Sequence, residues 1–377
     1  MVIASLSLCL LAIVACSLVI WRGCDSFEEA SGYLGRNMPA GVRGATINAI
    51  GSSLPELLTT MILLFVFIDE DGYSGGIATC AGSAVFNAVI IPAMCIVAVL
   101  AFGVVRKGKK QRVTAIEVGR PTILRDGLFF VGAELVLIVL LGSAVMYWWM
   151  GAVLISVYLV YFGYLMIQFR RGSGAAAGED EDDDDDHEDD EPRPLLAALL
   201  ALDFNQLLFA GRRLSTGRAW AVLGAATAVV GAACFVLSYA VVEAAHLLDV
   251  PLYFTTVILA AAATSVPDTA LSIKDARAGD YDDAVSNALG SNIFDITVAL
   301  GLPLMLYGLI HGPVHLSATS GSAAAVQILR IALLVITTVV LVIFLAGRKM
   351  GWGKAVLLLG LFAGWTVFVV GRAAGWI

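Results

Sequence analysis

The sequence predicts an all-α integral membrane protein with ten transmembrane helices, arranged as two inverted five-helix repeats with broken helices at the membrane midplane. Three observations predict this fold class. The 377 residues are 59% hydrophobic and only 14% charged, whereas soluble domains contain about 25% charged residues. The apolar residues form ten runs that can each cross a bilayer, which takes about 20 residues. A polar motif also occurs twice, once in each half of the chain.

The ten apolar runs differ in how often they are interrupted. The second, third, seventh and eighth contain glycine, proline or polar interruptions, and the others are plainer. The first run has no basic residues before it, so we expect a span and not a cleaved signal peptide. In order, the predicted spans lie at 1–21, 37–68, 74–105, 122–144, 146–168, 219–247, 252–275, 283–311, 326–346 and 353–373.

The spans divide the chain into three parts. Residues 1–168 form the first repeat and residues 219–377 the second, with a linker at 169–218 between them. Within the linker, the run at 179–191 is almost wholly acidic, and we expect it to be disordered because it cannot bury a core. Residues 195–214 are apolar with a few charges, and we expect a helix lying at the membrane surface.

Basic residues predict the orientation in the membrane, because lysine and arginine accumulate on the cytoplasmic side. With the N-terminus outside, only Arg330 and Arg372 fall clearly on the external side. We therefore expect an integral protein of the plasma (cell) membrane with external N- and C-termini and a cytoplasmic linker. The six cysteines show no CxxC spacing, which argues against a zinc site.

The repeated motif places polar side chains inside apolar spans. Residues 51–60 read GSSLPELLTT and residues 263–272 read ATSVPDTALS, each combining hydroxyls, a proline and an acid. A charge at the bilayer centre costs at least ~2.5 kcal/mol, so two such insertions indicate a site. Each is followed by a second element, GSAVFNAVIIP at 82–92 and GSNIFDITVALGLP at 290–303. An odd number of spans separates the copies, so they enter the membrane in opposite directions and meet near the midplane. The four motifs occupy 44–57, 82–87, 263–268 and 290–295.

Helical spacing groups oxygen-bearing side chains around each acid. Residues three and four apart share one face of a helix, and each motif proline also deprives a nearby carbonyl of its helical partner. Such an all-oxygen set suits hard cations such as Ca2+ and Na+, whereas soft metals require cysteine or histidine. The predicted groups are Ser52 and Ser53 with Glu56, Thr264 and Ser265 with Asp268, Ser83 with Asn87, and Ser291 with Asp295.

At these residues the sequence resembles the Ca2+:cation antiporter superfamily, and within it the sodium/calcium exchangers. The matching pieces are GATINAIGSSLPEL with GSAVFN, and ATSVPD with SNALGSNIFD. The resemblance implies that several Na+ and one Ca2+ alternately occupy overlapping sites. It implies that Glu56 and Asp268 are the shared carboxylates and that Asn87 and Asp295 are the central pair. It further implies hydroxyl ligands from Ser52, Ser53, Ser83, Thr264, Ser265 and Ser291, and carbonyl ligands from Ala49 and Ala261.

The sequence therefore predicts an electrogenic secondary antiporter that exchanges Na+ for Ca2+ by alternating access. Asp295 resembles the potassium-dependent branch of the family, so K+ co-transport stays open. The closest alternative is a Ca2+/H+ antiporter on the same scaffold. An intramembrane aspartyl protease is less favoured because a GxGD element is absent, and a Ca2+ channel is distinguished by needing no counter-ion. We expect no enzymatic activity, no resident cofactor, and no nucleic-acid or protein partner, only the transported ions and the lipid bilayer.

Overall fold

The computed structural model describes residues 5–36, 49–67, 72–106, 109–173, 194–316, 322–347 and 349–376, and most of these residues are helical. The first half contains α1 (Leu6–Leu34), α3 (Ala49–Ser52), α4 (Leu54–Val66), α5 (Gly72–Phe102), α6 (Arg120–Leu140) and α7 (Trp148–Ser173). The second half contains α10 (Thr216–Leu248), α11 (Leu252–Thr255), α12 (Ala261–Thr264), α13 (Val266–Ala278), α14 (Tyr281–Phe294), α15 (Leu300–Ile310), α16 (Ser322–Leu345) and α17 (Trp352–Ala373). Two π-helical segments, η3 (Thr256–Ala260) and η4 (Asp295–Ala299), interrupt this second half.

Among the described residues, seven helices are long and apolar enough to cross a membrane, or eight if the bent pair at 252–264 and 266–278 is one span. The difference from ten lies in the second and fourth predicted spans. Within the described residues, α4 has only 13 residues. Helix α6 has 21 residues but includes Arg125, Asp126 and Glu134. The inverted arrangement of ten helices stays a prediction.

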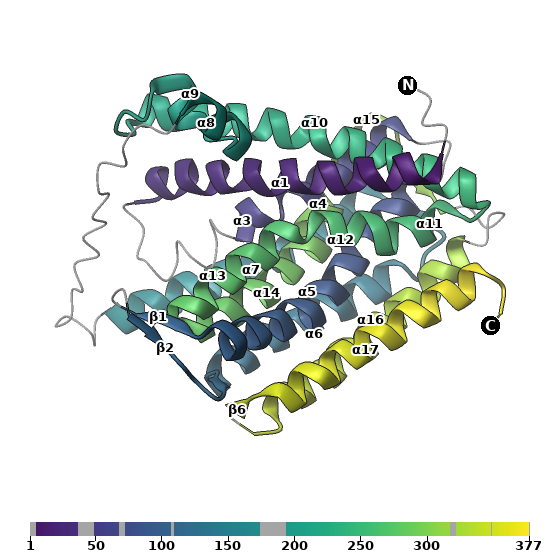
Figure 1. The fold of residues 1–377 in the computed structure, drawn as a ribbon. Coiled ribbons are helices and arrows are strands. Elements are labelled where there is room, and N and C mark those ends of the chain that lie inside the picture. Colours follow the sequence, from purple (N-terminus) through teal and green to yellow (C-terminus); the bar gives the residue numbers. More distant parts are fainter. Residues whose placement is uncertain are drawn as a thin grey trace.

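The helices enclose a central group of elements that carry the repeated motifs. Helices α1 and α10 pack side by side along one flank, and α16 and α17 cover α5 on another (Figure 1). Between these flanks, α5 contacts α4, α12, α13 and α14. A large apolar core that includes Ile91, Phe130 and Ile293 surrounds this centre. The motif residues are therefore held inside the protein and away from lipid.

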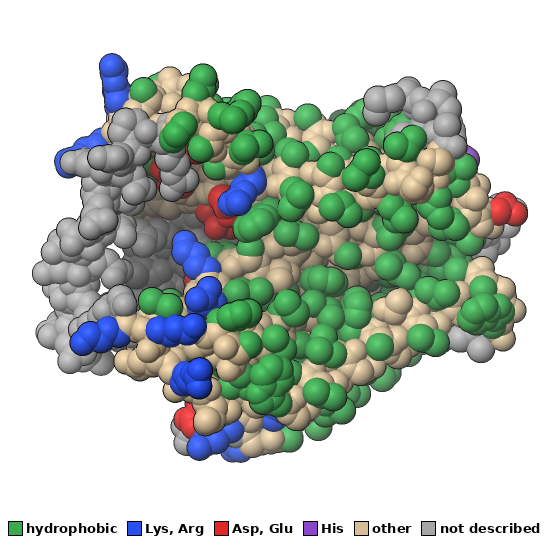
Figure 2. Space-filling model, in the orientation of Figure 1, with side chains coloured by type: hydrophobic (Ala, Val, Ile, Leu, Met, Phe, Trp, Pro, Cys, Tyr) green, Lys and Arg blue, Asp and Glu red, His purple; other side chains and the backbone are tan. Residues whose placement is uncertain are grey.

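Short antiparallel ribbons lie at the ends of the helices. Strand β1 (Val104–Arg106) pairs with β2 (Lys109–Gln111), and β3 (Ile116–Glu117) pairs with β6 (Lys349–Met350). A third ribbon joins β4 (Val145–Met146) to β5 (Val314–His315). On the face shown in Figure 2, lysine and arginine side chains gather at the end where β1, β2 and β6 lie, while α1 begins and α17 ends at the opposite end (Figure 1).

The predicted surface helix at 195–214 is divided into two, α8 (Leu195–Ala201) and α9 (Phe204–Phe209). The division has a local cause, because Leu202 adopts a left-handed backbone conformation that ends α8, and the Asp203 side chain caps α9. The Ser26 hydroxyl donates to the Leu202 carbonyl at 2.7 Å and so ties this segment to α1. Its place at a membrane surface stays a prediction, and the acidic run at 179–191 lies outside the described residues.

Candidate cation-binding site

Two helix breaks, one in each half of the chain, position the candidate site. Helix α3 ends at Ser52 and α4 begins at Leu54, and in the same way α12 ends at Thr264 and α13 begins at Val266. A proline occupies the first turn of each following helix, where its missing N–H is tolerated. The second break bends the chain by 41°. Glu56 and Asp268 each lie in the first turn after a break, where the positive end of the helix dipole favours an anionic side chain.

The structure brings the predicted side chains together inside the protein. All ten have 0% of their surface exposed, and the two predicted carbonyl donors, Ala49 and Ala261, are also buried. The cluster combines three carboxylates, one amide and six hydroxyls contributed by both repeats. These side chains are Ser52, Ser53, Glu56, Ser83, Asn87, Thr264, Ser265, Asp268, Ser291 and Asp295.

Ser83 on α5 connects the two repeats. Its hydroxyl lies 3.1 Å from Oε1 of Glu56 and 2.9 Å from Oδ2 of Asp295, and it also pairs with the Ser265 hydroxyl at 2.9 Å. A hydroxyl has one hydrogen to donate, so Ser83 can satisfy only one of these two carboxylates at a time. The other carboxylate then needs a proton or a cation.

Asp268 is the most fully hydrogen-bonded of the three carboxylates. Its Oδ1 accepts from Ser291 at 2.7 Å, and its Oδ2 accepts from Nδ2 of Asn87 at 3.2 Å. Ser52 of the first repeat also interacts with Asp268, just as Thr264 of the second repeat interacts with Glu56. Each motif acid is therefore approached by one hydroxyl of its own repeat and one of the opposite repeat.

Several oxygens of the cluster have no hydrogen-bond partner within the described part of the chain. They are Oγ of Ser53, Oε2 of Glu56, Oδ1 of Asn87 and Oδ1 of Asp295. The ion pairs found among the described residues lie elsewhere, such as Arg125 with Asp126. Buried polar atoms are normally satisfied, and buried charges are paired or bind metal ions. The unsatisfied oxygens therefore leave the cluster suited to cations.

The chemistry of the cluster restricts which cations it suits. No group of three or more His, Cys, Asp and Glu side chains within the described ranges is arranged to hold a metal ion by itself. A cation here must also use hydroxyl, amide and backbone oxygens. Hard cations such as Ca2+ accept this mixture and take about six to eight oxygens.

The carbonyls of Ala49 and Ala261, which we expected to bind cations, are already hydrogen-bonded. The carbonyls of Ala49 and Ala261 each accept a helical hydrogen bond at 3.1 Å, from the N–H groups of Ser53 and Ser265. A second lone pair of the Ala49 carbonyl remains for an ion, whereas the Ala261 carbonyl also accepts the Thr264 hydroxyl at 3.3 Å. By the helical i to i−4 pattern, the carbonyls that lose a donor through Pro55 and Pro267 are those of Gly51 and Ala263. These two carbonyls are further candidates that the spacing argument omitted.

One glycine controls how closely the repeats approach. A Cβ atom on Gly82 would lie 2.2 Å from the carbonyl oxygen of Val257 on η3 and 2.8 Å from Cβ of Ala261. Only glycine permits this contact between α5 and the broken segment of the second repeat. The equivalent Gly290 has no such requirement, because its nearest neighbour is the Tyr161 hydroxyl at 3.7 Å.

Of two further buried polar residues, Asn292 borders the cluster and Glu134 lies apart from it. Nδ2 of Asn292 donates to the Ala84 carbonyl at 3.0 Å and so joins α14 to α5. Asn292 precedes Asp295 by three residues, so the same helical spacing rule identifies it. Glu134 lies elsewhere, since it accepts a hydrogen bond of 2.6 Å from Thr337 between α6 and α16.

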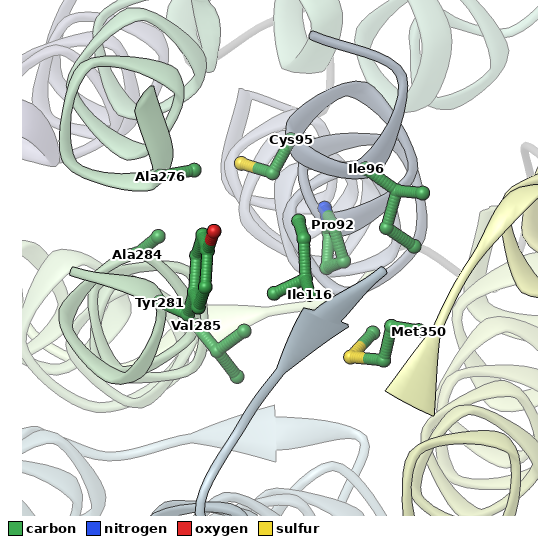
Figure 3. Close-up of a pocket in the computed structure, with 9 residues that line it drawn as sticks. All are labelled: Pro92, Cys95, Ile96, Ile116, Ala276, Tyr281, Ala284, Val285 and Met350. Carbon is green, nitrogen blue, oxygen red and sulfur yellow. The ribbon is translucent and has the colours of Figure 1, made fainter. Parts of the chain in front are cut away.

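A small pocket at the β1–β2 end of the molecule is not the site. Figure 3 shows that its lining comes from α5, α13, α14, β3 and β6, and none of the nine lining residues is charged. The candidate site is instead a closed cluster deeper along the same helices.

Comparison with known proteins identifies the family. The family model described as sodium/calcium exchanger protein matches residues 8–167 and 218–371. The chain belongs to this family. Members of this family are cation exchangers, which are transporters and not enzymes, and this argues against the protease alternative. The matched regions cover the helices of both halves and leave out the linker.

Individual relatives match over shorter stretches of the chain. Sodium/potassium/calcium exchanger 1 of Bos taurus is 48% identical over 83 residues, which are 22% of this chain and 7% of that protein. Sodium/potassium/calcium exchanger 2 of Homo sapiens is 47% identical over 83 residues, 22% of this chain and 13% of that protein. The chain thus matches only a small fraction of the length of these curated relatives.

Solved structures share the fold over nearly the whole chain. The H+/Ca2+ exchanger CAX has a TM-score of 0.63 at 15% identity and covers 95% of this chain and 79% of its own. The sodium-calcium exchanger NCX_Mj has a TM-score of 0.50 at 22% identity and covers 95% of this chain and 98% of its own. The exchanger fold is therefore common to all three chains.

Proposed function

We propose that this protein is an electrogenic antiporter that exchanges Na+ for Ca2+ by alternating access, with the ten buried side chains as ligands. One observation carries the proposal, namely a fully buried oxygen cluster with three carboxylates from two repeats and no basic partner among the described residues. Both ions compete for Glu56 and Asp268, which makes the exchange obligatory. An empty cluster of buried negative charge resists rearrangement, because uncompensated charge in the membrane is costly.

The charge on the cluster supports electrogenic exchange. One Ca2+ brings two positive charges and three Na+ bring three. A fixed set of carboxylates cannot neutralise both loads equally, so net positive charge moves with Na+. Asp295 raises the number of carboxylates in the cluster to three, and its Oδ1 has no partner in the described part of the chain.

We further propose that K+ is co-transported and that Asp295 is the residue on which this depends. The relatives matched at 47% to 48% identity are named sodium/potassium/calcium exchangers, although the match covers about a fifth of this chain. In the cluster, Asp295 accepts a hydrogen bond from Ser83, whose hydroxyl also lies 3.1 Å from Glu56. A cation bound at Asp295 would therefore change the hydrogen bonding of Glu56 through this shared hydroxyl.

A Ca2+/H+ antiporter remains the second candidate. It is favoured by the same shared hydroxyl, because Glu56 and Asp295 approach one Ser83 Oγ that can donate to only one of them. A proton on either acid would resolve this conflict. The six hydroxyls and the amide favour Na+, since proton exchange needs no oxygen cage for a monovalent metal ion.

The proposed membrane orientation is the one that the distribution of basic residues in the sequence predicts. We place both termini outside the plasma membrane and the linker in the cytoplasm, which puts the basic β1–β2 end on the cytoplasmic side in accord with the positive-inside rule. No protein partner and no resident cofactor enter the proposal.

Ion fluxes in proteoliposomes test the proposal. Vesicles loaded with Na+ are diluted into Na+-free medium containing 45Ca2+, with and without K+, and parallel vesicles carry only a pH gradient. We expect uptake that requires internal Na+, and a current on a solid-supported membrane whose sign shows net positive charge moving with Na+. Uptake driven by the pH gradient alone would establish the Ca2+/H+ alternative, and uptake with neither gradient would establish a channel.

A further inference from the structure

A line of polar side chains runs between α13 and α14 from the site toward the β1–β2 end. On α13 it consists of Asp268, Ser272 and Asp275, and on α14 of Ser291, Asn287 and Asp283. The spacings of three and four residues place each set on one face of its helix. The two sets face each other, since Ser291 donates to Asp268 at 2.7 Å and Nδ2 of Asn287 donates to Ser272 at 2.9 Å. We call these six residues the polar seam.

The seam reaches the surface at its far end. Ser272 is fully buried and Asn287 is 8% exposed, whereas Asp283 is exposed and Asp275 is partly exposed. Asp275 and Asp283 interact electrostatically across the two helices. Helix α13 contacts β1, so this acidic end lies at the end of the molecule where Figure 2 shows the basic side chains.

The centre of the seam contains an acceptor that lacks a partner. Oδ1 of Asn287 is buried and has no hydrogen bond within the described part of the chain. The other atom of this amide, Nδ2, also lies 3.5 Å from the backbone carbonyl of Asp268. The amide therefore links the site to Ser272 and still presents one free oxygen between the two helices.

The first repeat lacks the charged part of this seam. With the motif offsets of 212 and 208 residues, Ser272 and Asn287 correspond to Thr60 and Thr79, while Asp275 and Asp283 correspond to Leu63 and Gly75. Thr60 pairs with Cys80 and Thr79 donates to its own helix, at the Gly75 carbonyl. Among the residues that the structure describes, the carboxylates of this seam have no counterpart at the corresponding positions of the first repeat.

The other contacts of α14 restrict which helix can move. Asp282 accepts the Gly119 N–H at 2.6 Å. One turn later, Ser286 donates to Asp126 at 2.8 Å, and Asp126 is also held by Arg125 and by Tyr161 on α7. The pocket in Figure 3 shows that α13 and α14 turn an apolar face to α5. Helix α14 is therefore anchored on α6 and α7.

We propose that the polar seam is the access route for Ca2+ and Na+ between Asp268 and the β1–β2 end, with Oδ1 of Asn287 as a transit ligand. The route is closed here because Asn287 bridges to Ser272. Asp275 and Asp283 concentrate cations at its mouth. The inference rests on the proposed function, since it assigns one path to the cations of that site.

Cysteine accessibility tests the route without measuring transport. Asn287→Cys is labelled with a cationic water-soluble thiol reagent applied to either side of sealed membrane vesicles. Lys109→Cys on β2 marks the β1–β2 side, Thr79→Cys is the matched control in the first repeat, and the unmodified protein with its six buried cysteines gives the background. We expect labelling from the β1–β2 side only, slowed roughly tenfold by Ca2+ at ten times its dissociation constant, and no labelling of Thr79→Cys from that side.

The outcomes separate this inference from the proposed function. No labelling of Asn287→Cys, labelling from the opposite side, or labelling that Ca2+ does not slow would overturn the route even if Na+ drives Ca2+ uptake. Absence of Na+-driven uptake in the unmodified protein would overturn the proposed function, whatever the labelling. Ser272→Cys, one hydrogen bond away, gives the same result if Asn287→Cys does not reach the membrane. In transport, Asn287→Leu should raise the half-saturating Ca2+ concentration about tenfold on the β1–β2 side, and Thr79→Val should not.

Discussion

Asn87 on α5 donates a hydrogen bond of 3.2 Å to Asp268 on α13, which lies 181 residues further along the chain. The same amide donates to Ser83 at 3.3 Å, and Ser83 contacts Glu56. The two motif acids are thus joined through one amide and one hydroxyl, both from α5. An ion bound at one acid therefore changes the hydrogen bonding of the other through this amide and this hydroxyl.

Removing the charge from either motif acid should stop transport and leave the protein folded. For Glu56→Gln and Asp268→Asn we expect Ca2+ uptake to fall at least about a hundredfold, because each change removes a carboxylate that both ions need. Neither change adds volume or an unpaired charge, so thermal unfolding should not shift downward. The measurement is 45Ca2+ uptake together with a melting curve of the purified protein.

Glu134→Gln is the matched control for these variants. Glu134 is also a buried glutamate within a helix, but its partner is Thr337 on α16. We expect uptake within about twofold of the unmodified protein, since losses of this size fall below 1 kcal/mol. Normal uptake by Glu56→Gln, or loss of uptake by Glu134→Gln alone, would contradict the assignment of the site.

Ser83 and Ser291 occupy equivalent positions in the two repeats, but we expect Ser83 to contribute more to Ca2+ affinity. Ser83 lies within hydrogen-bond distance of Glu56, Asp295 and Ser265, whereas Ser291 bonds to Asp268. We therefore expect Ser83→Ala to raise the half-saturating Ca2+ concentration by about tenfold or more, and Ser291→Ala to have a smaller effect. Ser83→Thr should restore most of the affinity. Equal effects of the two alanine variants would show that Ser83 is not the shared contact.

Asp295 should decide the role of K+. If a K+ ion is co-transported, Asp295→Asn should abolish the stimulation of Ca2+ uptake by K+ while Na+-driven uptake continues. The physical reason is that Asp295 provides the third carboxylate, and its loss leaves one less charge to neutralise. Uptake is measured over a series of K+ concentrations in both proteins. K+ stimulation that survives in Asp295→Asn would place the K+ site elsewhere.

Helical spacing and the predicted inversion of the repeat were sufficient to predict which side chains gather at the centre. Glu56 and Asp268 each carry hydroxyls one turn away, and inversion requires the two copies to meet. Neither rule fixes the register between the copies. Ser83 contacts Asp295, 212 residues further along the chain. This contact depends on the axial position of α5 relative to α14, which is set by side-chain packing and not by sequence spacing.

Other features depended on local backbone conformation that no periodicity encodes. The π-helical turns η3 and η4 add one residue per turn around Thr256 and Asp295, which rotates the side chains that follow. The carbonyls of Ala49 and Ala261 keep a helical hydrogen bond, and the prolines release those of Gly51 and Ala263 instead. Leu202 ends α8 in a left-handed conformation, which an uninterrupted apolar run does not indicate.

Gly82→Ala should separate the two repeats at the site. The new Cβ would lie 2.2 Å from the Val257 carbonyl oxygen, and a backbone atom cannot move away as a flexible side chain can. Over-packing of this kind destabilises by about 1–3 kcal/mol, and pushing η3 outward should also weaken Ca2+ binding.

Gly224→Ala on α10 is the matched control, because nothing lies within 4 Å of its added Cβ. That change should leave binding intact and raise stability by roughly 0.5–1 kcal/mol, as alanine is the better helix former. The measurements are melting temperature and Ca2+ binding by calorimetry, and unchanged binding in Gly82→Ala would show that close contact between α5 and η3 is not needed for the site.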